Sequence, residues 1–268
     1  MITSIKNPLV KQIRKLHRTK GRREQNLLLL EGTHLLQTAC QANCSLVTLC
    51  FTEQWQVRYP QLWTIASKKA QRIELVTTEV LQSMTTTVKP DGVVATMVSL
   101  KQPESVITNF QLGLILERLQ DPGNLGTIIR TAVATEVNGI WLTDDSVEVD
   151  NPKVLRSSAG AWFDVPMIVS FDLSTVIRNY QQTGVQVIAT LPTATQPYWE
   201  IDFTKPSLIV LGNEGAGLSQ KLVTLADKIV NIPLGKKVES LNVAIACAVL
   251  LYEGKRQRVN SQRSSMLN

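Results

Sequence analysis

The chain has 268 residues, of which 44% are hydrophobic and 19% are charged. This composition supports a buried core and excludes a disordered chain, a coiled coil and a collagen-like polymer. A length well above about 150 residues favours two domains. Charge is unevenly spread: residues 1–105 carry 14 basic and 7 acidic side chains, residues 106–253 carry 10 and 15, and residues 254–268 carry 4 and none. The basic front part and tail predict a polyanionic partner for only part of the chain.

The four cysteines, at positions 40, 44, 50 and 247, follow no pairing pattern. In a chain of this length, that favours a reducing compartment over a disulfide scaffold. The first three lack the paired Cys-x-x-Cys spacing of structural zinc sites, so we predict no metal site. No apolar signal-peptide core is visible, and the apolar runs are shorter than the ~20 residues of a membrane span. We therefore expect a soluble, cytoplasmic protein that does not bind membranes.

The front part begins with a basic segment, residues 8–18, in which Leu9, Ile13 and Leu16 recur at helical spacing. Strands are predicted at residues 26–30, 45–51, 72–75 and 92–98, and helices at 35–40, 62–70 and 78–83. This alternation predicts a small α/β domain. The Gln-Pro-Glu-Ser segment at 102–105 precedes a new apolar run and is the best linker candidate. It divides the chain into predicted domains of residues 1–105 and 106–268.

The second part alternates more regularly. Strands are predicted at residues 112–116, 139–142, 165–169, 185–189, 208–211 and 229–232, and helices at 125–135, 152–158, 173–182, 219–225 and 241–253. The strands are near-continuous apolar runs, typical of a parallel sheet covered on both faces. Ligands bind such sheets beyond the carboxyl ends of the strands, so the loops after Leu116, Leu211 and Ile232 are the candidate sites. The polar tail from Gly254 onward is expected to fray.

The first loop leads into a helix that contains one arginine among apolar neighbours. Asp-Pro-Gly at residues 121–123 favours a turn, and Asn124 is a natural N-cap for the helix that follows. Arg130 is either an ordinary surface side chain or one held to grip a phosphate or activate a hydroxyl. This segment alone leaves both interpretations open.

The second loop contains Gly212, Gly215 and Gly217 directly after an apolar strand. Their spacing matches neither a P-loop nor the dinucleotide-binding fingerprint. A plain glycine-rich turn is the simpler interpretation. Glu214, in the middle of the turn, is unexpected for a phosphate cradle and suits a cationic or hydroxylated ligand better.

The third loop contains a Pro-Leu-Gly turn at residues 233–235 and leads into a long apolar helix. Ser240 can cap this helix. Asn242 is expected in its first turn, where a buried amide would need a partner. An ordinary core helix is the alternative.

Both histidines, His17 and His34, lie in the basic front part. The second part therefore lacks a histidine general base, which disfavours Ser-His-Asp and zinc hydrolysis. A nucleotide-phosphate enzyme is disfavoured because no P-loop lysine follows the glycines. A reaction that depends on positioning more than on a strong base fits better.

In their order and spacing, the three loops resemble the three motifs of the SpoU (TrmH-type) RNA ribose 2′-O-methyltransferases of the SPOUT superfamily. Motif one corresponds to residues 124–126 and 130–132, motif two to 211–218, and motif three to 232–235 and 240–243. Residues 151–160 resemble the family's segment between motifs one and two. Residues 4–8, 30–32 and 91–95 resemble its substrate-binding extension.

The resemblance implies an α/β SPOUT methyltransferase domain with a C-terminal trefoil knot, preceded by a small α/β RNA-binding domain. It implies S-adenosylmethionine as the cofactor and a homodimer formed through the knotted domain. Arg130 is then the residue that activates the ribose 2′-hydroxyl, and the other catalytic positions are Asn124, Glu214, Ser240 and Asn242. The implied cofactor-binding residues are Thr190, Leu191, Pro192, Leu211, Gly212, Asn213, Gly215, Gly217, Ile232, Pro233, Leu234 and Leu241.

The basic front segment is the predicted RNA contact, although without the resemblance a solvated basic helix would be the simpler interpretation. The candidate RNA-binding residues are Lys6, Lys11, Arg14, Lys15, Arg18, Lys20, Arg22, Arg23, Lys153 and Arg156. Ribosomal RNA is the favoured substrate and transfer RNA the alternative. A non-catalytic RNA-binding or ribosome-assembly protein on the same fold is the rival, and the intact motif residues speak against it.

Overall fold

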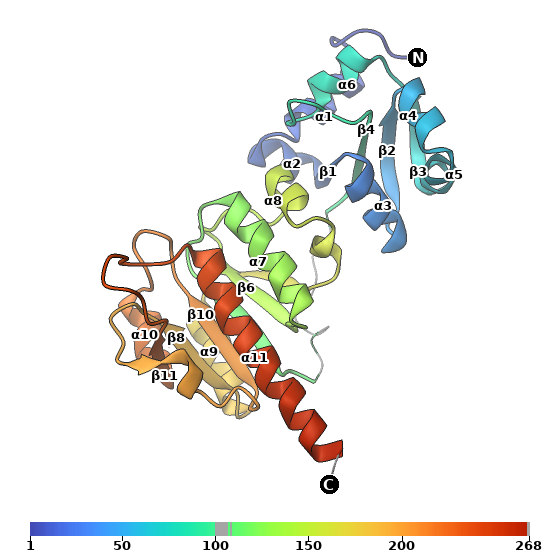
Figure 1. Cartoon of the computed structure of the whole chain (residues 1–268). Helices are drawn as coiled ribbons and strands as arrows, with labels where there is room; N and C mark the ends of the chain where they lie inside the picture. Colours follow the sequence, from blue (N-terminus) through green and yellow to red (C-terminus); the bar gives the residue numbers. More distant parts are fainter. Residues whose placement is uncertain (100–106, 108, 267–268) are drawn as a thin grey trace. The chain divides into compact units, whose positions relative to one another are not determined.

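The computed structural model describes residues 1–99, 107 and 109–266 (Figure 1). The chain forms two compact units. The front unit consists of Met1–Leu100 and Glu148–Phe163, and the C-terminal unit consists of Lys101–Val147 and Asp164–Asn268. The predicted linker at residues 102–105 lies outside the described residues. Among the described residues, no helix is both long and apolar enough to cross a membrane.

The front unit is built on a four-stranded sheet with the order β1-β4-β2-β3. Its strands are β1 (Leu27–Glu31), β2 (Leu46–Phe51), β3 (Ala70–Leu75) and β4 (Val93–Val98). β4 lies between β1 and β2 and is antiparallel to both, whereas β2 and β3 are parallel. The four strands predicted for this part are confirmed.

Seven helices accompany this sheet in the described part of the front unit. They are α1 (Pro8–Lys15), α2 (Thr19–Gln25), α3 (Thr33–Gln41), α4 (Glu53–Arg58), α5 (Pro60–Lys69), α6 (Thr78–Met84) and α8 (Pro152–Ser157). α1 begins where the Asn7 side chain accepts a hydrogen bond from the Leu9 amide at 2.9 Å. Its buried Leu9, Val10 and Ile13 join Val80 and Leu81 of α6 in one apolar core. The sequence did not predict α2 and α4, since α2 has no large apolar residue and the two of α4, Trp55 and Val57, are not at helical spacing.

The C-terminal unit contains a seven-stranded sheet with the order β7-β6-β5-β10-β8-β11-β9. Its strands are β5 (Leu112–Leu116), β6 (Gly139–Thr143), β7 (Met167–Ser170), β8 (Gln186–Thr190), β9 (Gln196–Pro197), β10 (Ser207–Leu211) and β11 (Lys228–Asn231). Every neighbouring pair is parallel, which confirms the predicted parallel sheet. The trefoil knot stays a prediction.

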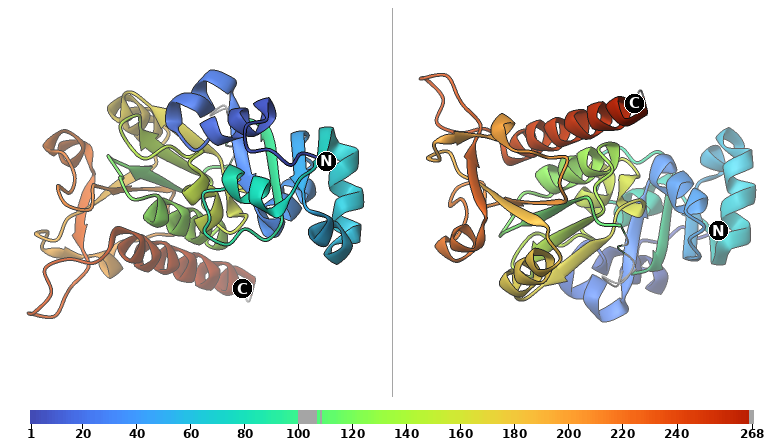
Figure 2. Two further views of the ribbon diagram at one scale, coloured as in Figure 1. Left: turned by 90° about the horizontal axis from the view of Figure 1, so that it is seen from above. Right: turned by 90° about the horizontal axis from the view of Figure 1, so that it is seen from below.

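The helices of this unit are α7 (Pro122–Ala134), α9 (Leu173–Gln182), α10 (Gln220–Leu225) and α11 (Val243–Met266). α11 packs against α7, and the two lie side by side in Figure 2. The expected frayed tail is wrong, because α11 continues through Met266. The Gln257 side chain anchors this extension: it donates to the Ile201 carbonyl at 2.9 Å and accepts from the Phe203 amide at 2.9 Å.

Residues 148–163 pack with the front unit although they follow the boundary predicted at residue 105. α8 lies against β1, and Trp162 Nε1 donates to the Val149 carbonyl at 2.8 Å. The division into functional domains at residue 105 stays a prediction. The contacts within the chain differ from it in one segment, because residues 148–163 belong to the front unit.

Candidate active site

The carboxyl ends of β5 and β10 lie side by side, because Leu116 pairs with Leu211 in parallel register. The loops that follow these strands, together with those after β8 and β11, therefore meet at one edge of the sheet. A cavity of about 210 Å³ lies there. Its walls come from Thr190, Leu191, Pro192, Leu211, Gly212, Asn213, Glu214, Gly215, Gly217, Ile232, Leu234, Ser240, Leu241, Val243 and Ala246.

This cavity gathers the predicted cofactor-binding residues from three separate segments. All of them line it except Pro233, which is not among the lining residues. Val243 and Ala246 also line it, although the sequence analysis placed them only in a core helix. The sequence feature that could have identified them as lining residues is their position in the first turns of α11, directly after motif three.

The glycine-rich turn is closed by backbone hydrogen bonds at its base. Asn213 and Gly217 exchange two bonds, with the Asn213 amide donating at 3.1 Å and the Gly217 amide at 3.0 Å. The Asn213 side chain accepts from the Gly215 amide at 2.9 Å and donates to the Arg118 carbonyl at 2.8 Å. Gly217 has a φ of +67°, a conformation that favours glycine. Asn213 therefore shapes the turn and ties it to the loop after β5.

Three of the predicted catalytic side chains form a connected network. Asn124 Nδ2 donates to Glu214 Oε1 at 3.1 Å, and Asn242 Nδ2 donates to Asn124 Oδ1 at 3.0 Å. One residue of this triad comes from each motif, across sequence separations of 90 and 118 residues. Ser240 lines the adjacent cavity.

The expected helix caps are wrong at two positions. α7 begins at Pro122, and Asp121 caps it by accepting from the Asn124 amide at 2.8 Å. The Asn124 side chain is therefore not used as a cap and is available to the triad. At α11, Asn242 rather than Ser240 is the cap, accepting from the Ala244 amide at 2.9 Å.

The Glu214 carboxylate is held ionised by its donors. Partial burial raises its pKa, but hydrogen bonds from the Asn124 side chain and from the Asp121 and Gln120 amides outweigh burial, so the net pKa lies below its usual range. Glu214 therefore carries its negative charge at neutral pH beside the cavity. A general acid role at this position is disfavoured.

Arg130 lies on the exposed surface of α7, six residues after Asn124. Among the described residues, its guanidinium has no hydrogen-bond or ion-pair partner. The structure therefore does not join Arg130 to the triad directly. Its five N–H donors are free for an external anion or hydroxyl.

Most of the predicted RNA-binding side chains are exposed on the front unit: Lys6, Lys11, Arg14, Lys15, Arg18, Lys20, Arg23 and Lys153. Arg23 also pairs with Glu148 at 2.8 Å. Arg156 is half-buried, and its guanidinium pairs with Glu31 at 2.9 Å.

Arg22 is a correction to the RNA-binding set, because it is only 2% exposed. Its guanidinium pairs with Glu148, bonds to Asp150 at 3.1 Å and donates to the Leu16 carbonyl at 3.2 Å. α2 approaches α1 closely here: a Cβ on Gly21 would lie 2.0 Å from the Lys15 carbonyl oxygen. That approach buries Arg22, so its guanidinium is occupied by contacts within the front unit and is not presented to solvent.

The site therefore consists of a glycine-rich cavity at the carboxyl edge of a parallel sheet, with the polar triad beside it. A separate unit carries most of the exposed basic side chains named above. The sequence profile of the SpoU rRNA methylase family matches residues 111–252, and that of the MRM3-like substrate binding domain matches residues 7–95. The chain belongs to the SpoU rRNA methylase family and is a methyltransferase.

Relatives resemble the chain over nearly its whole length. An uncharacterized tRNA/rRNA methyltransferase of Synechocystis is 51% identical over 96% of this chain and 94% of the relative. The 23S rRNA (guanosine(2553)-2′-O)-methyltransferase RlmP of Bacillus subtilis is 32% identical over 94% and 97%. The crystal structure of an AdoMet-bound rRNA methyltransferase from Sinorhizobium meliloti matches with a TM-score of 0.86 and 32% identity, over 95% and 97% of the two chains.

Proposed function

We propose that this protein transfers a methyl group from S-adenosylmethionine to a ribose 2′-hydroxyl of ribosomal RNA. The observation that carries the proposal is the cavity at the carboxyl edge of the sheet, with the Asn124–Glu214–Asn242 triad beside it. The family membership and the names of the relatives give the same reaction and substrate class.

The residues of the cavity fit this cofactor. Apolar side chains such as Leu191, Leu211 and Leu241 surround the space, as the apolar adenine ring requires. The Thr190 hydroxyl is buried, with no hydrogen-bond partner among the described residues, so a bound polar group would satisfy it. The glycine-rich turn brings backbone N–H and C=O groups to the ligand without side chains between them. Ionised Glu214 stands at the same wall and suits a cationic ligand.

The cofactor supplies a methyl group on a sulfonium, which is already a good leaving group. The task left for the protein is to position the ribose and stabilise the charge that develops on its 2′-oxygen. The free guanidinium of Arg130 performs that stabilisation. Arginine stays protonated in proteins, so Arg130 acts as an electrostatic activator and not as the base.

Ribosomal RNA is favoured over transfer RNA by the front unit. It matches the MRM3-like substrate binding domain, and the mitochondrial rRNA methyltransferase 3 of Xenopus tropicalis is 28% identical over 91% of this chain and 73% of the relative. A cytoplasmic location is part of the same proposal and is supported by bacterial relatives such as RlmP. The rival, a non-catalytic RNA-binding protein, has no need of the intact triad.

The function is tested by mapping ribose 2′-O-methylation in rRNA from a strain that lacks the gene. We expect one site to lose its methyl group and the purified protein with S-adenosylmethionine to restore it on the same RNA. Methylation restored only on tRNA would shift the substrate class. Binding of rRNA without any methyl transfer would favour the non-catalytic rival.

Neutralising the exposed charges of α1 and of Arg18, which precedes α2, should weaken RNA binding. With Lys11, Arg14, Lys15 and Arg18 replaced by glutamine, the slope of log K against log salt should become shallower by about 3, because each lost phosphate contact removes about 0.7–0.9. Filter binding from low to high salt measures it. Replacing Lys68, exposed on α5, and its half-buried neighbour Lys69 is the control, and an unchanged slope in the α1 variant would move the RNA surface elsewhere.

A homodimer is part of the same proposal. Ile245 and Tyr252 of α11 are 53% and 54% exposed and stand seven residues apart, so they lie on one face of the helix. A second copy covering this face would bury both side chains. Sedimentation of the full chain and of an Ile245→Lys variant measures whether this face carries the dimer.

A further inference from the structure

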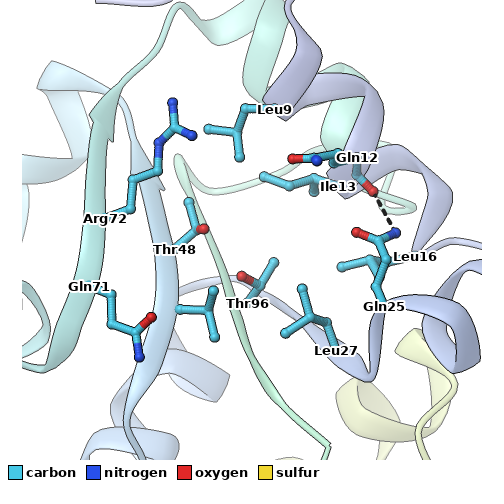
Figure 3. A pocket seen from close by; sticks show the side chains of 11 residues that line it. Leu9, Gln12, Ile13, Leu16, Gln25, Leu27, Thr48, Gln71, Arg72 and Thr96 are labelled. Carbon is cyan, nitrogen blue, oxygen red and sulfur yellow. Dashed lines mark hydrogen bonds between the residues drawn. The ribbon is translucent and has the colours of Figure 1, made fainter.

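The front unit contains a second cavity, of about 310 Å³, between α1 and one face of the sheet. Figure 3 shows its lining: Leu9, Ile13 and Leu16 approach from α1, Thr48 and Thr96 rise from β2 and β4, and Gln71 and Arg72 stand on β3. The remaining lining residues are Gln12, Gln25, Leu27 and Val47. All of them belong to the front unit.

The floor of this cavity is polar, whereas the adjoining part of the same sheet face is not. Thr48 and Thr96 pair across β2 and β4 and are only 5% and 2% exposed. The Thr96 hydroxyl is buried and has no hydrogen-bond partner among the described residues. Along the same strands, Cys50 and Val94 pack instead into the apolar core under α1. A buried hydroxyl without a partner destabilises the fold and calls for an explanation.

The side chains around the floor offer neutral hydrogen-bonding groups between apolar walls. Gln12, Gln25 and Gln71 line the cavity, and each amide carries both donors and acceptors. The one guanidinium at the rim, that of Arg72, is paired with Glu74 at 2.8 Å. Apolar walls with neutral donors and acceptors suit a flat heteroaromatic ring, and they do not suit a phosphate.

An exposed positive charge lies beside one of the lining glutamines. Lys15 stands three residues after Gln12, so the two side chains are neighbours on the surface of α1, and Lys15 is exposed. An RNA backbone held by Lys15 would run past Gln12. The volume is at the lower end of the range for small-molecule sites, about 300 Å³ and above, which fits one base and excludes a duplex.

We propose that this cavity receives a single unstacked nucleobase of the RNA substrate, whose polar edge is bound by Thr48, Thr96 and the surrounding glutamine amides. Sequence-specific RNA recognition commonly uses bases splayed out of the helix in this way. The site lies in the front unit, so this base is recognised by residues other than those that line the cofactor cavity. The proposal rests on RNA being the substrate.

Thr96→Val separates this role from a structural one. Valine has nearly the same shape and removes only the hydroxyl, so the melting temperature should stay unchanged or rise. The KM for rRNA from the deletion strain should increase about five- to tenfold, because a base atom loses its partner. We expect kcat and the affinity for S-adenosylmethionine to stay unchanged. Thr64→Val on α5, an exposed threonine of the same unit, is the matched control and should leave KM unchanged.

Gln71→Ala provides an independent variant at an exposed position, so folding is not in question, and it too should raise the KM. The same rRNA is also bound in filter assays without cofactor, where both variants should weaken binding. The filter-binding assay does not depend on methyl transfer. If wild-type protein binds rRNA but transfers no methyl group, the proposed function is wrong, and the cavity can still be tested by rRNA binding. If Thr96→Val raises the melting temperature while rRNA binding and KM stay at the wild-type values, the cavity holds only water and the inference is wrong.

Discussion

Replacing Arg130 with alanine should lower the rate of methyl transfer by about 100- to 1000-fold while S-adenosylmethionine binds as in the wild type. The size follows from losing one group that stabilises a developing oxyanion. Arg130 is exposed on α7, is outside the lining of the cofactor cavity and has no partner among the described residues, so its removal disturbs neither the fold nor the cofactor. Single-turnover methylation and calorimetric titration of the cofactor measure the two effects separately.

Two further variants define what Arg130 contributes. Arg130→Lys keeps the charge but loses the planar fork of donors, so it should recover only part of the rate. Arg178→Ala removes another exposed arginine, on α9 of the same unit, and should leave the rate unchanged. Loss of cofactor binding together with activity in Arg130→Ala would show that the residue is structural and would contradict the assigned role.

Replacing Gly212 with alanine should reduce the affinity for S-adenosylmethionine by about 100-fold or more and the free energy of unfolding by about 1–3 kcal/mol. A Cβ at this position would lie 2.2 Å from the Gly217 carbonyl carbon and 2.4 Å from the Leu218 nitrogen. Both are backbone atoms, so the turn itself must open. Opening it breaks the paired bonds between Asn213 and Gly217 that close the wall of the cavity.

Calorimetric titration of the cofactor and thermal denaturation measure these two losses. Gly235→Ala is the matched control for stability: it lies in the loop after β11, and an added Cβ would meet nothing within 4 Å. Its melting temperature should equal that of the wild type. Wild-type cofactor affinity in Gly212→Ala would mean that the glycine-rich turn does not form the wall of the binding site.

Much of the C-terminal unit could be predicted because its signals are local. Apolar runs such as residues 112–116 and 208–211 are buried on both faces of the sheet; Glu117 follows the first and Gly212 the second. Parallel strands place their carboxyl ends together, so the three candidate loops had to meet. The approach of Asn124, Glu214 and Asn242 followed from this rule, whereas their bonding order did not, since it depends on side-chain directions that no local pattern fixes.

The errors have a common physical origin in contacts between distant residues. Arg22 looks like its basic neighbours in sequence, and its burial against the Leu16 carbonyl, Glu148 and Asp150 distinguishes it. The tail after Gly254 is polar enough to fray, but the bonds from Gln257 to residues 201 and 203 keep it helical. At α7 the Asn124 side chain bonds to the triad, and Asp121 is the cap instead. At α11 Asn242 is closer to the start of the helix than Ser240 and is the cap.

The packing of residues 148–163 on the front unit has a consequence for the order in which this protein folds during synthesis. Arg22 is buried against Glu148 and Asp150, and Glu31 is buried against Arg156. A buried charge left without its partner costs about 3–5 kcal/mol. The first hundred residues leaving the ribosome therefore cannot reach their final stability until Arg156 has also emerged, by which time β5, α7 and β6 are already outside. The unit that begins first is completed only after residues 101–147 of the second have been made.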